Sequence, residues 1–245
     1  MKVLLAALLA ATLTLPPAVE QAYSEGETLD YTVQWTKITA GTARMTIAPH
    51  GEDMYRITSV AKSSGGFSRL VKVRDEIETF VARSDFSTLR YVKRLDEKGD
   101  KMEEVTTVEE GVATRKRKKI KKVAVPRPVY DPFSVIYYMR TLDLAPGKAY
   151  DFTLISDGKV YTVHAKVLRR EKVQTQVGTY DAVVVEPRMT SGGVEREEKL
   201  HVWYSEDERH IPVRIRTEVK FGSVTATLRG IQSGVSSIDP PVLSK

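Results

Sequence analysis

Alternation of apolar and polar residues along most of the chain is the feature that most constrains its fold. Tyr31, Val33 and Trp35 alternate with polar residues, and the same period of two runs through residues 213–220 and 224–229. Successive side chains of a strand point to opposite faces of a sheet, so this pattern is typical of strands with one buried face. Further stretches of this kind lie near residues 42–48, 54–62, 75–82, 88–95, 101–108, 149–155, 159–168, 181–188 and 197–204.

Short turn sequences separate these stretches, among them Gly51-Glu52-Asp53, Lys98-Gly99-Asp100 and Asp157-Gly158. Close spacing with glycine in the turn favours antiparallel hairpins. Strands do not alternate with long helical patterns, which argues against a parallel α/β fold. We therefore predict a mainly β protein, built as an antiparallel, strongly curved sheet or open barrel.

One segment, residues 131–142, breaks the period of two. Asp131 is a good helix N-cap, and Pro132 suits the first helical position. One face of the predicted helix carries Phe133, Ile136, Tyr137 and Arg140, and most other positions are apolar as well. A helix that is apolar on nearly all sides must be packed on both sides. We expect one buried helix near residues 132–142, on the concave side or in the mouth of the sheet.

A weak internal repeat surrounds this helix. Residues 26–33 resemble residues 147–154, and Ser64-Gly65-Gly66 recurs as Ser191-Gly192-Gly193 at a similar offset. A duplication explains the repeat, and so does the general likeness of any two antiparallel meanders. The predicted layout is a single β-rich domain over residues 23–235, in which candidate halves 24–125 and 144–232 are joined by the 131–142 helix, with a flexible tail over 236–245.

The N-terminus has the pattern of an export signal. A short basic start, Met1-Lys2, precedes a mostly apolar run over residues 3–15 and then Pro16-Pro17. The run is shorter than the ~20 apolar residues that span a bilayer. We expect residues 1–22 to be a cleaved signal peptide, with Ala18 or Ala22 before the cut. The mature protein would then be periplasmic and soluble without a transmembrane span; an uncleaved anchor is the alternative.

Composition excludes several kinds of chemistry. The chain has no cysteine, which rules out disulfides, thiolate metal sites, a cysteine nucleophile and a lipoprotein anchor. The four histidines have no metal-ligand spacing, and the sequence has neither a nucleophile elbow nor a phosphate-binding glycine loop. Within the acidic cluster Asp75, Glu76 and Glu78, the two glutamates fit one wet strand face. We expect no catalytic residue, no metal, no cofactor and no enzymatic activity.

Four sequence elements together carry a family resemblance: Gly26-Glu27 with Leu29-x-Tyr31, Asp131-Pro132-Phe133-Ser134-x-x-Tyr137-Tyr138-x-Arg140, Val177-Gly178-Thr179-Tyr180-Asp181-Ala182, and Val202-Trp203-Tyr204-Ser205-x-Asp207 with Ile211-Pro212-Val213 and Gly222-Ser223-Val224. Over roughly residues 24–232 the chain resembles the bacterial exported family catalogued as domain of unknown function 3108. The resemblance implies a periplasmic, β-rich protein without an assigned activity, so it supplies no catalytic residue.

Two groups of residues are candidates for binding. The candidate lining of a ligand cavity between sheet and helix is Trp35, Phe133, Tyr137, Arg140 and Trp203. In that interpretation Arg140 holds the acidic head of a ligand while aromatic rings line an apolar slot. Core packing explains the same residues, with Arg140 tied to a carboxylate or to strand-end carbonyls.

The second group is the densest basic run of the chain: Arg115, Lys116, Arg117, Lys118, Lys119, Lys121 and Lys122. Such a run binds anionic surfaces, and in an exported protein these are lipid head groups or lipopolysaccharide rather than nucleic acid. A solvated hairpin edge is the alternative, because lysine also blocks edge-to-edge strand pairing. If the chain turns at Gly111, Glu103 and Glu104 would form cross-strand ion pairs with part of the run.

The functional prediction is an exported, non-enzymatic protein that binds or carries an apolar or amphipathic envelope molecule, such as a lipid, in the cavity between sheet and helix. The alternative is a structural or assembly partner of a cell-envelope complex. That protein would contact an envelope protein partner through strand edges or the basic hairpin.

Overall fold

The computed structural model describes residues 15–70, 72–97, 99–195, 199–219 and 221–234. Most of the expected signal segment (1–14) and the expected tail (236–245) lie outside the described residues. The helices are α1 (Pro17–Glu25), α2 (Phe67–Leu70) and α3 (Ser134–Met139). The strands are β1 (Glu27–Trp35), β2 (Ile38–His50), β3 (Met54–Ser63), β4 (Val73–Ala82), β5 (Thr88–Glu97), β6 (Asp100–Glu109), β7 (Val112–Lys116), β8 (Ile120–Ala124), β9 (Ala149–Ser156), β10 (Lys159–Thr175), β11 (Gly178–Ser191), β12 (Val194–Glu195), β13 (Leu200–Ser205), β14 (Pro212–Val219) and β15 (Gly222–Ser233).

The strands form one antiparallel sheet of 15 strands, which confirms the predicted fold class. Its order is β8-β7-β6-β5-β4-β3-β2-β1-β15-β14-β13-β11-β10-β9, and β12 pairs with β11. Each half of the chain is a meander, and the two halves meet where β1 pairs with β15 over the whole of β1. Strands β1–β6 and the six main strands from β9 to β15 follow one another in the same order across the sheet.

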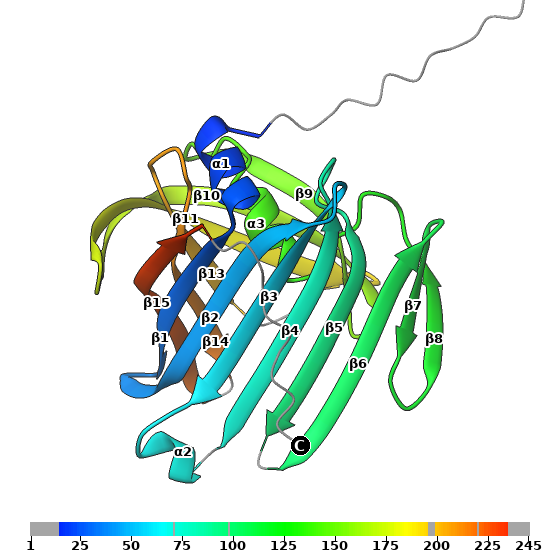
Figure 1. The fold of residues 1–245 in the computed structure, drawn as a ribbon, viewed down its shortest axis with the longest axis horizontal. Helices are drawn as coiled ribbons and strands as arrows, with labels where there is room; N and C mark the ends of the chain where they lie inside the picture. The colour runs from blue at the N-terminus through cyan, green and yellow to red at the C-terminus, as the bar shows by residue number, and fades with distance from the viewer. Residues whose placement is uncertain (1–14, 71, 98, 196–198, 220, 235–245) are drawn as a thin grey trace, which may run out of the picture.

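The sheet curves into an open barrel, with α1 and α3 together at its upper end and α2 at its lower end in Figure 1. The edge strands β8 and β9 approach each other without forming a ladder, since Val123 of β8 and Ile155 of β9 pack in one small apolar cluster. Tyr130, in the segment between β8 and α3, forms an isolated bridge with Leu154 of β9, and the Nζ atom of Lys93 lies 2.6 Å from Oδ1 of Asp157. We call this junction the seam.

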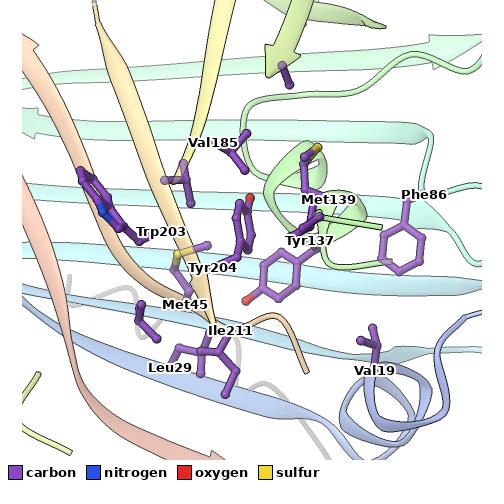
Figure 2. Close-up of a cluster of buried hydrophobic side chains, with 14 of the residues drawn as sticks. Val19, Leu29, Met45, Phe86, Tyr137, Met139, Val185, Trp203, Tyr204 and Ile211 are labelled. Atoms are coloured by element: carbon purple, nitrogen blue, oxygen red, sulfur yellow. The ribbon is translucent and has the colours of Figure 1, made fainter. Parts of the chain in front are cut away.

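The core lies inside the curve of the sheet. The apolar side chains, which occupy every second position of a strand, point toward it. Leu29 and Tyr31 of β1 are buried on this face, and Met45 and Ile47 of β2 lie beside them. Figure 2 shows how Tyr137 of α3 and Val19 of α1 join this cluster of side chains from the sheet. The alternation that predicted the strands therefore also specifies which side chains fill the barrel.

The buried helix is present, but it is shorter than the predicted 132–142. The α-helical turns cover Ser134–Met139, and residues 140–142 continue as tighter turns in which each N–H bonds the carbonyl three residues back. Asp131 caps the start, because its Oδ1 accepts hydrogen bonds from the backbone N–H groups of Phe133 (2.8 Å) and Ser134 (3.0 Å). Asp131 thus bonds N–H groups at the start of the helix as predicted, but the helix begins at Ser134, with Phe133 at its N-cap position, and Pro132 is not its first residue.

Helix α1 covers the upper end of the core beside α3. Val19 and Tyr23 are fully buried, and the hydroxyl of Tyr23 donates a 2.9 Å hydrogen bond to the carbonyl of Tyr137. Both expected cleavage positions, Ala18 and Ala22, lie within this helix. No helix among the described residues is long and apolar enough to cross a membrane.

The basic run forms the β7–β8 hairpin, which the alternation did not predict as two strands. In a lysine-rich edge strand, long basic side chains line both faces. Apolar and polar residues therefore do not alternate along it. The hairpin turns back at Gly111 onto β6, as expected from the acidic stretch upstream.

Candidate functional site

Arg140 lies inside a closed polar cluster at the upper end of the barrel. Its guanidinium is fully buried and bonds Glu27, with Nη1 2.6 Å from Oε1. Arg209 lies 2.7 Å from the other carboxylate oxygen of Glu27, and Nε of Arg140 donates to the carbonyl of Arg209. Burial alone would raise the pKa of Glu27, but Arg140 and Arg209 lower it below its ordinary value. The donors of Arg140 are therefore engaged by the protein itself.

Aromatic rings enclose this cluster. The Arg140 guanidinium lies 5.1 Å from the ring centroid of Tyr23 and 5.7 Å from that of Tyr137. Tyr137 is fully buried, burial raises its pKa well above the ordinary value, and its hydroxyl has no partner among the described residues. Phe133 is only partly buried and packs against the edge of the core. Arg140 and Tyr137 thus belong to a packed cluster, Phe133 packs against the core, and none of the three lines the chambers described below.

The two tryptophans lie in different surroundings. Trp203 is buried, and its Nε1 donates a 2.7 Å hydrogen bond to Oε2 of Glu171. Trp35 is 38% exposed and bonds the carbonyl of Phe221 through Nε1 at 3.0 Å. Of the five candidates for a ligand cavity, Trp35 is the one that lines a chamber of ligand size.

The candidates for an anionic surface lie on the β7–β8 hairpin, and Arg115 differs from the others in its burial. Arg115 points to the buried face, where its guanidinium lies 2.6 Å from Oε2 of the fully buried Glu104. This contact is one of the expected cross-strand pairs. The other members of the run are exposed: Lys116, Arg117, Lys118, Lys119, Lys121 and Lys122.

The lower end of the barrel holds an apolar chamber, which we call the lower chamber. It has a volume of about 420 Å³, within the range of small-molecule sites. Strands β1 to β4, α2 and β15 supply its walls, and the side chains that shape it are Val33, Trp35, Ala61, Phe67, Val73 and Val224. The Trp35 and Phe67 rings meet edge to face with centroids 5.9 Å apart, so aromatic surface forms one wall.

One carboxyl group, that of Asp75, lies in the wall of the lower chamber. Its Oδ1 atom is buried and has no hydrogen-bond partner among the described residues. Burial, together with repulsion from Glu97, raises the pKa of Asp75 to about 6. A buried acceptor without a partner costs free energy, so the oxygen is available to a donor group of a bound molecule.

Sequence reasoning noticed Asp75 but did not separate it from its neighbours. Glu76 and Glu78 point outward and pair with Arg74 and Arg56, as expected for one wet face. Asp75 has the opposite phase, which it shares with Val73 and Ile77 on the interior face of β4. The signal that would have identified Asp75 is a carboxylate at a strand position where the alternation predicts an apolar residue.

A second, smaller apolar chamber lies beside α3, but none of the five residues expected to line a cavity between sheet and helix lines it. Its volume is about 220 Å³, and it is lined by Val135, Ile136 and Met139 of the helix and by Phe152, Val163 and Val202 of the sheet. This volume is below the ~300 Å³ at which ligand sites begin, and a larger hollow of about 370 Å³ beside Tyr138 and Phe152 has a more polar lining, so the lower chamber is the better candidate for an apolar ligand. Among the described residues, no three His, Asp or Glu side chains gather as a metal site would require.

A family model described as "Protein of unknown function (DUF3108)" matches residues 30–229, which confirms the resemblance drawn from the sequence. The comparison with curated proteins found no match.

Solved structures with this fold include a "beta-barrel-like protein of domain of unknown function DUF1849" from Brucella abortus. It is 11% identical with a TM-score of 0.62, over 85% of this chain and 97% of that one. A Bacteroides fragilis protein, described as a candidate exported protein with a YmcC-like fold, is 10% identical with a TM-score of 0.31, over 84% of this chain and 95% of that one. The first likeness supports the barrel-like fold, and the second is too distant to carry an argument.

Proposed function

The chain belongs to the DUF3108 family, to which no activity is assigned, and we propose that it is an exported, non-enzymatic protein that binds an amphipathic envelope molecule in the lower chamber. The observation that carries this proposal is a partly open apolar chamber of about 420 Å³ with one unpartnered carboxyl oxygen in its wall. A packed core would leave neither the volume nor the orphan oxygen.

The lining defines the chemistry of the ligand. Val33, Val73 and Val224 offer apolar contact, and each Å² of apolar surface removed from water contributes about 25 cal/mol before the costs of association. Asp75 offers the hydrogen-bonding group. A ligand with an apolar body and one hydroxyl or amine group satisfies both parts of the lining.

Export is the second part of the proposal. It is supported by the basic start, apolar run and proline break at the N-terminus, which match a secretory signal. The predicted location is the periplasm, with the protein soluble. Detection of the protein in the periplasmic fraction after osmotic shock tests this part, and retention in the cytoplasm would contradict it.

Blocking the chamber tests the binding proposal. Ala61 lines the chamber, so Ala61→Phe places a ring in the ligand space. We expect the purified parent protein to release a lipid-like molecule on solvent extraction and to bind an acyl-chain fluorophore at one site. Ala61→Phe should weaken fluorophore binding at least tenfold.

Ala124→Phe is the matched control, because Ala124 lies exposed on edge strand β8 and the same ring is added there outside the chamber. It should bind the fluorophore as the parent does. A parent protein that releases no lipid-like molecule and ignores the fluorophore would overturn the proposal, provided that its circular dichroism shows the folded β structure.

A second candidate function is that of an assembly partner acting through the basic hairpin. It is favoured by the exposed lysines of β8 and by Ile120, which is 67% exposed on this last strand of the sheet. An unpaired strand edge of this kind accepts a strand of another protein. Lys118→Gln/Lys119→Gln/Lys122→Gln should then lose a stoichiometric partner in crosslinked cells, whereas the chamber variant Ala61→Phe should retain it.

A further inference from the structure

Large apolar side chains are exposed together around two neighbouring turns at the lower end of the barrel. Ile38, at the start of β2, is 60% exposed, and Phe221, in the turn between β14 and β15, is 72% exposed. Trp35 and Val219 lie beside them at 38% and 41%. We call these four residues the rim. Half of the large exposed apolar residues of the described chain belong to it.

The rim is held in one piece by the sheet. Trp35 pairs in register with both Ile38 of β2 and Val224 of β15, and its ring nitrogen bonds the carbonyl of Phe221. The N–H of Thr36 also donates a 2.6 Å hydrogen bond to Ser223, which ties the β1–β2 turn to the β14–β15 turn. The two turns therefore present their apolar side chains as a fixed surface.

The rim adjoins the lower chamber through Trp35. Trp35 belongs to both, since it is exposed at the rim and lines the chamber. Helix α2, which supplies Phe67 to the chamber wall, lies at the same lower end in Figure 1. A surface that covers the rim therefore also lies against Trp35, which lines the lower chamber.

Basic side chains flank the apolar rim. Lys37 lies in the β1–β2 turn, and Lys62, Arg69 and Lys72 lie on or beside α2; all four are exposed. The acidic side chain nearest in sequence to Phe221 is Glu218, which lies 3.9 Å from Lys199. Apolar and aromatic residues flanked by lysine and arginine are typical of surfaces that enter the head-group region of a bilayer.

We propose that the rim docks on an anionic lipid bilayer, with Ile38, Trp35 and Phe221 entering the head-group region and the flanking bases contacting lipid phosphates. Burial of Ile38 and Phe221 drives insertion, because both side chains are exposed to water in the free protein. Each base near an anionic bilayer strengthens binding about fivefold at physiological salt. This surface differs from the basic β7–β8 hairpin, and docking does not require a ligand in the chamber.

Co-sedimentation with vesicles tests the proposal. We expect the purified protein to bind vesicles of phosphatidylglycerol and phosphatidylcholine, and to bind pure phosphatidylcholine much more weakly. Ile38→Ser/Phe221→Ser should lower the partition coefficient at least tenfold. Lys37→Gln/Lys72→Gln should lower it by a similar factor at low salt, with the difference fading at 1 M salt.

The matched control is Val112→Ser/Val194→Ser, which removes two exposed apolar residues of β7 and β12, outside the rim. It should bind vesicles as the parent does. Since the chain has two tryptophans, Trp203→Phe leaves Trp35 as the sole reporter, and its emission should shift to the blue on docking.

Three outcomes would overturn the docking proposal. The first is that the rim variant Ile38→Ser/Phe221→Ser still binds vesicles, whereas a Lys118→Gln/Lys119→Gln variant of the hairpin does not. Another is a rim variant that turns a dimer into a monomer, which would make the rim an interface between copies. The third is no vesicle binding by the parent. Fluorophore binding that survives in the rim variant would leave the chamber function standing, so the two proposals fail separately.

Discussion

At the scale of single residues, the buried ion pair of Arg140 and Glu27 is the feature on which the upper end of the barrel depends. Both side chains are fully buried, so neither charge is solvated by water. Each charge is stabilised mainly by the other. Glu27→Gln would leave the Arg140 charge without its carboxylate. We expect a loss of about 3–5 kcal/mol in the free energy of unfolding, measured by urea denaturation.

Glu103→Gln is the control for this variant. Glu103 also pairs with an arginine, since its Oε2 lies 2.7 Å from Nε of Arg94, but its side chain is 58% exposed. Exposed pairs contribute about 0–1 kcal/mol, so the control should unfold almost as the parent does. Equal losses in the two variants would contradict the assignment of Arg140 to a closed, structural pair.

Asp75 makes the stability of the protein depend on pH. Its pKa is raised from 3.8 to about 6, so between these values the folded protein holds a proton that the unfolded chain has lost. Stability therefore falls as pH rises through this window. Asp75→Asn removes the effect and should be more stable than the parent above pH 6, with no gain below about pH 4. The gain should be less than the ~1.4 kcal/mol per pKa unit of a fully buried group, because Asp75 is partly exposed.

Thermal unfolding between pH 4 and pH 8 measures this difference, with the exposed Asp100→Asn as control. An Asp75→Asn variant that gains no stability relative to the parent above pH 6 would show that Asp75 is not desolvated in the empty protein.

At the scale of elements, sequence patterns predicted the strands and other local features. They did not predict contacts between residues that are distant along the chain. The period of two located the main strands, and Asp131 was recognised as a cap, because both signals are local. The identity of the partners of Arg140 was not predictable: Glu27 and Arg209 are far from it along the chain, and only the folded sheet brings them together. The alternation showed that Asp75 faces the interior, but the empty space beside it depends on residues from five strands and α2.

Helix α3 provides a prediction at this scale. Besides capping the helix, Asp131 accepts hydrogen bonds through Oδ2 from the hydroxyls of Thr79 (2.6 Å) and Thr88 (2.7 Å), so it joins α3 to strands β4 and β5. Asp131→Ala would remove all of these bonds in a fully buried place. We expect a loss of about 2–4 kcal/mol in the free energy of unfolding, since each unsatisfied buried group costs about 1–3 kcal/mol.

Asp131→Asn keeps an oxygen for the two backbone N–H groups and should lose less than Asp131→Ala. Asp143→Ala is the matched control, because Asp143 also accepts a backbone N–H, that of Ala145, but on the exposed loop after the helix. Its loss should stay below about 1 kcal/mol. An Asp143→Ala loss as large as that of Asp131→Ala would mean that burial of the cap contributes nothing.

At the scale of the whole molecule, the two meanders are joined very differently at their two junctions. Strands β1 and β15 pair along all of β1, from Glu27 to Trp35. At the seam, the isolated bridge of Tyr130 with Leu154 and the ion pair of Lys93 with Asp157 replace a ladder. A small apolar cluster that includes Val125 and Ile155 adds to them. The barrel should therefore open first at the seam, because opening free energy follows local hydrogen bonding and burial.

Hydrogen exchange measures where the barrel opens. Amides of β8 and β9 should exchange faster than those of β1 and β15, and Lys93→Gln, which releases the β9–β10 turn from β5, should accelerate exchange at β9 but not at β1 or β15. Lys172→Gln is the matched control: Lys172 lies at the same 2.6 Å from Asp181, but both side chains are largely exposed and within one hairpin, so exchange should not change. If Lys93→Gln accelerates exchange equally at β1 and β15, the sheet opens as one unit, and the seam is not the weak junction that its sparse contacts indicate.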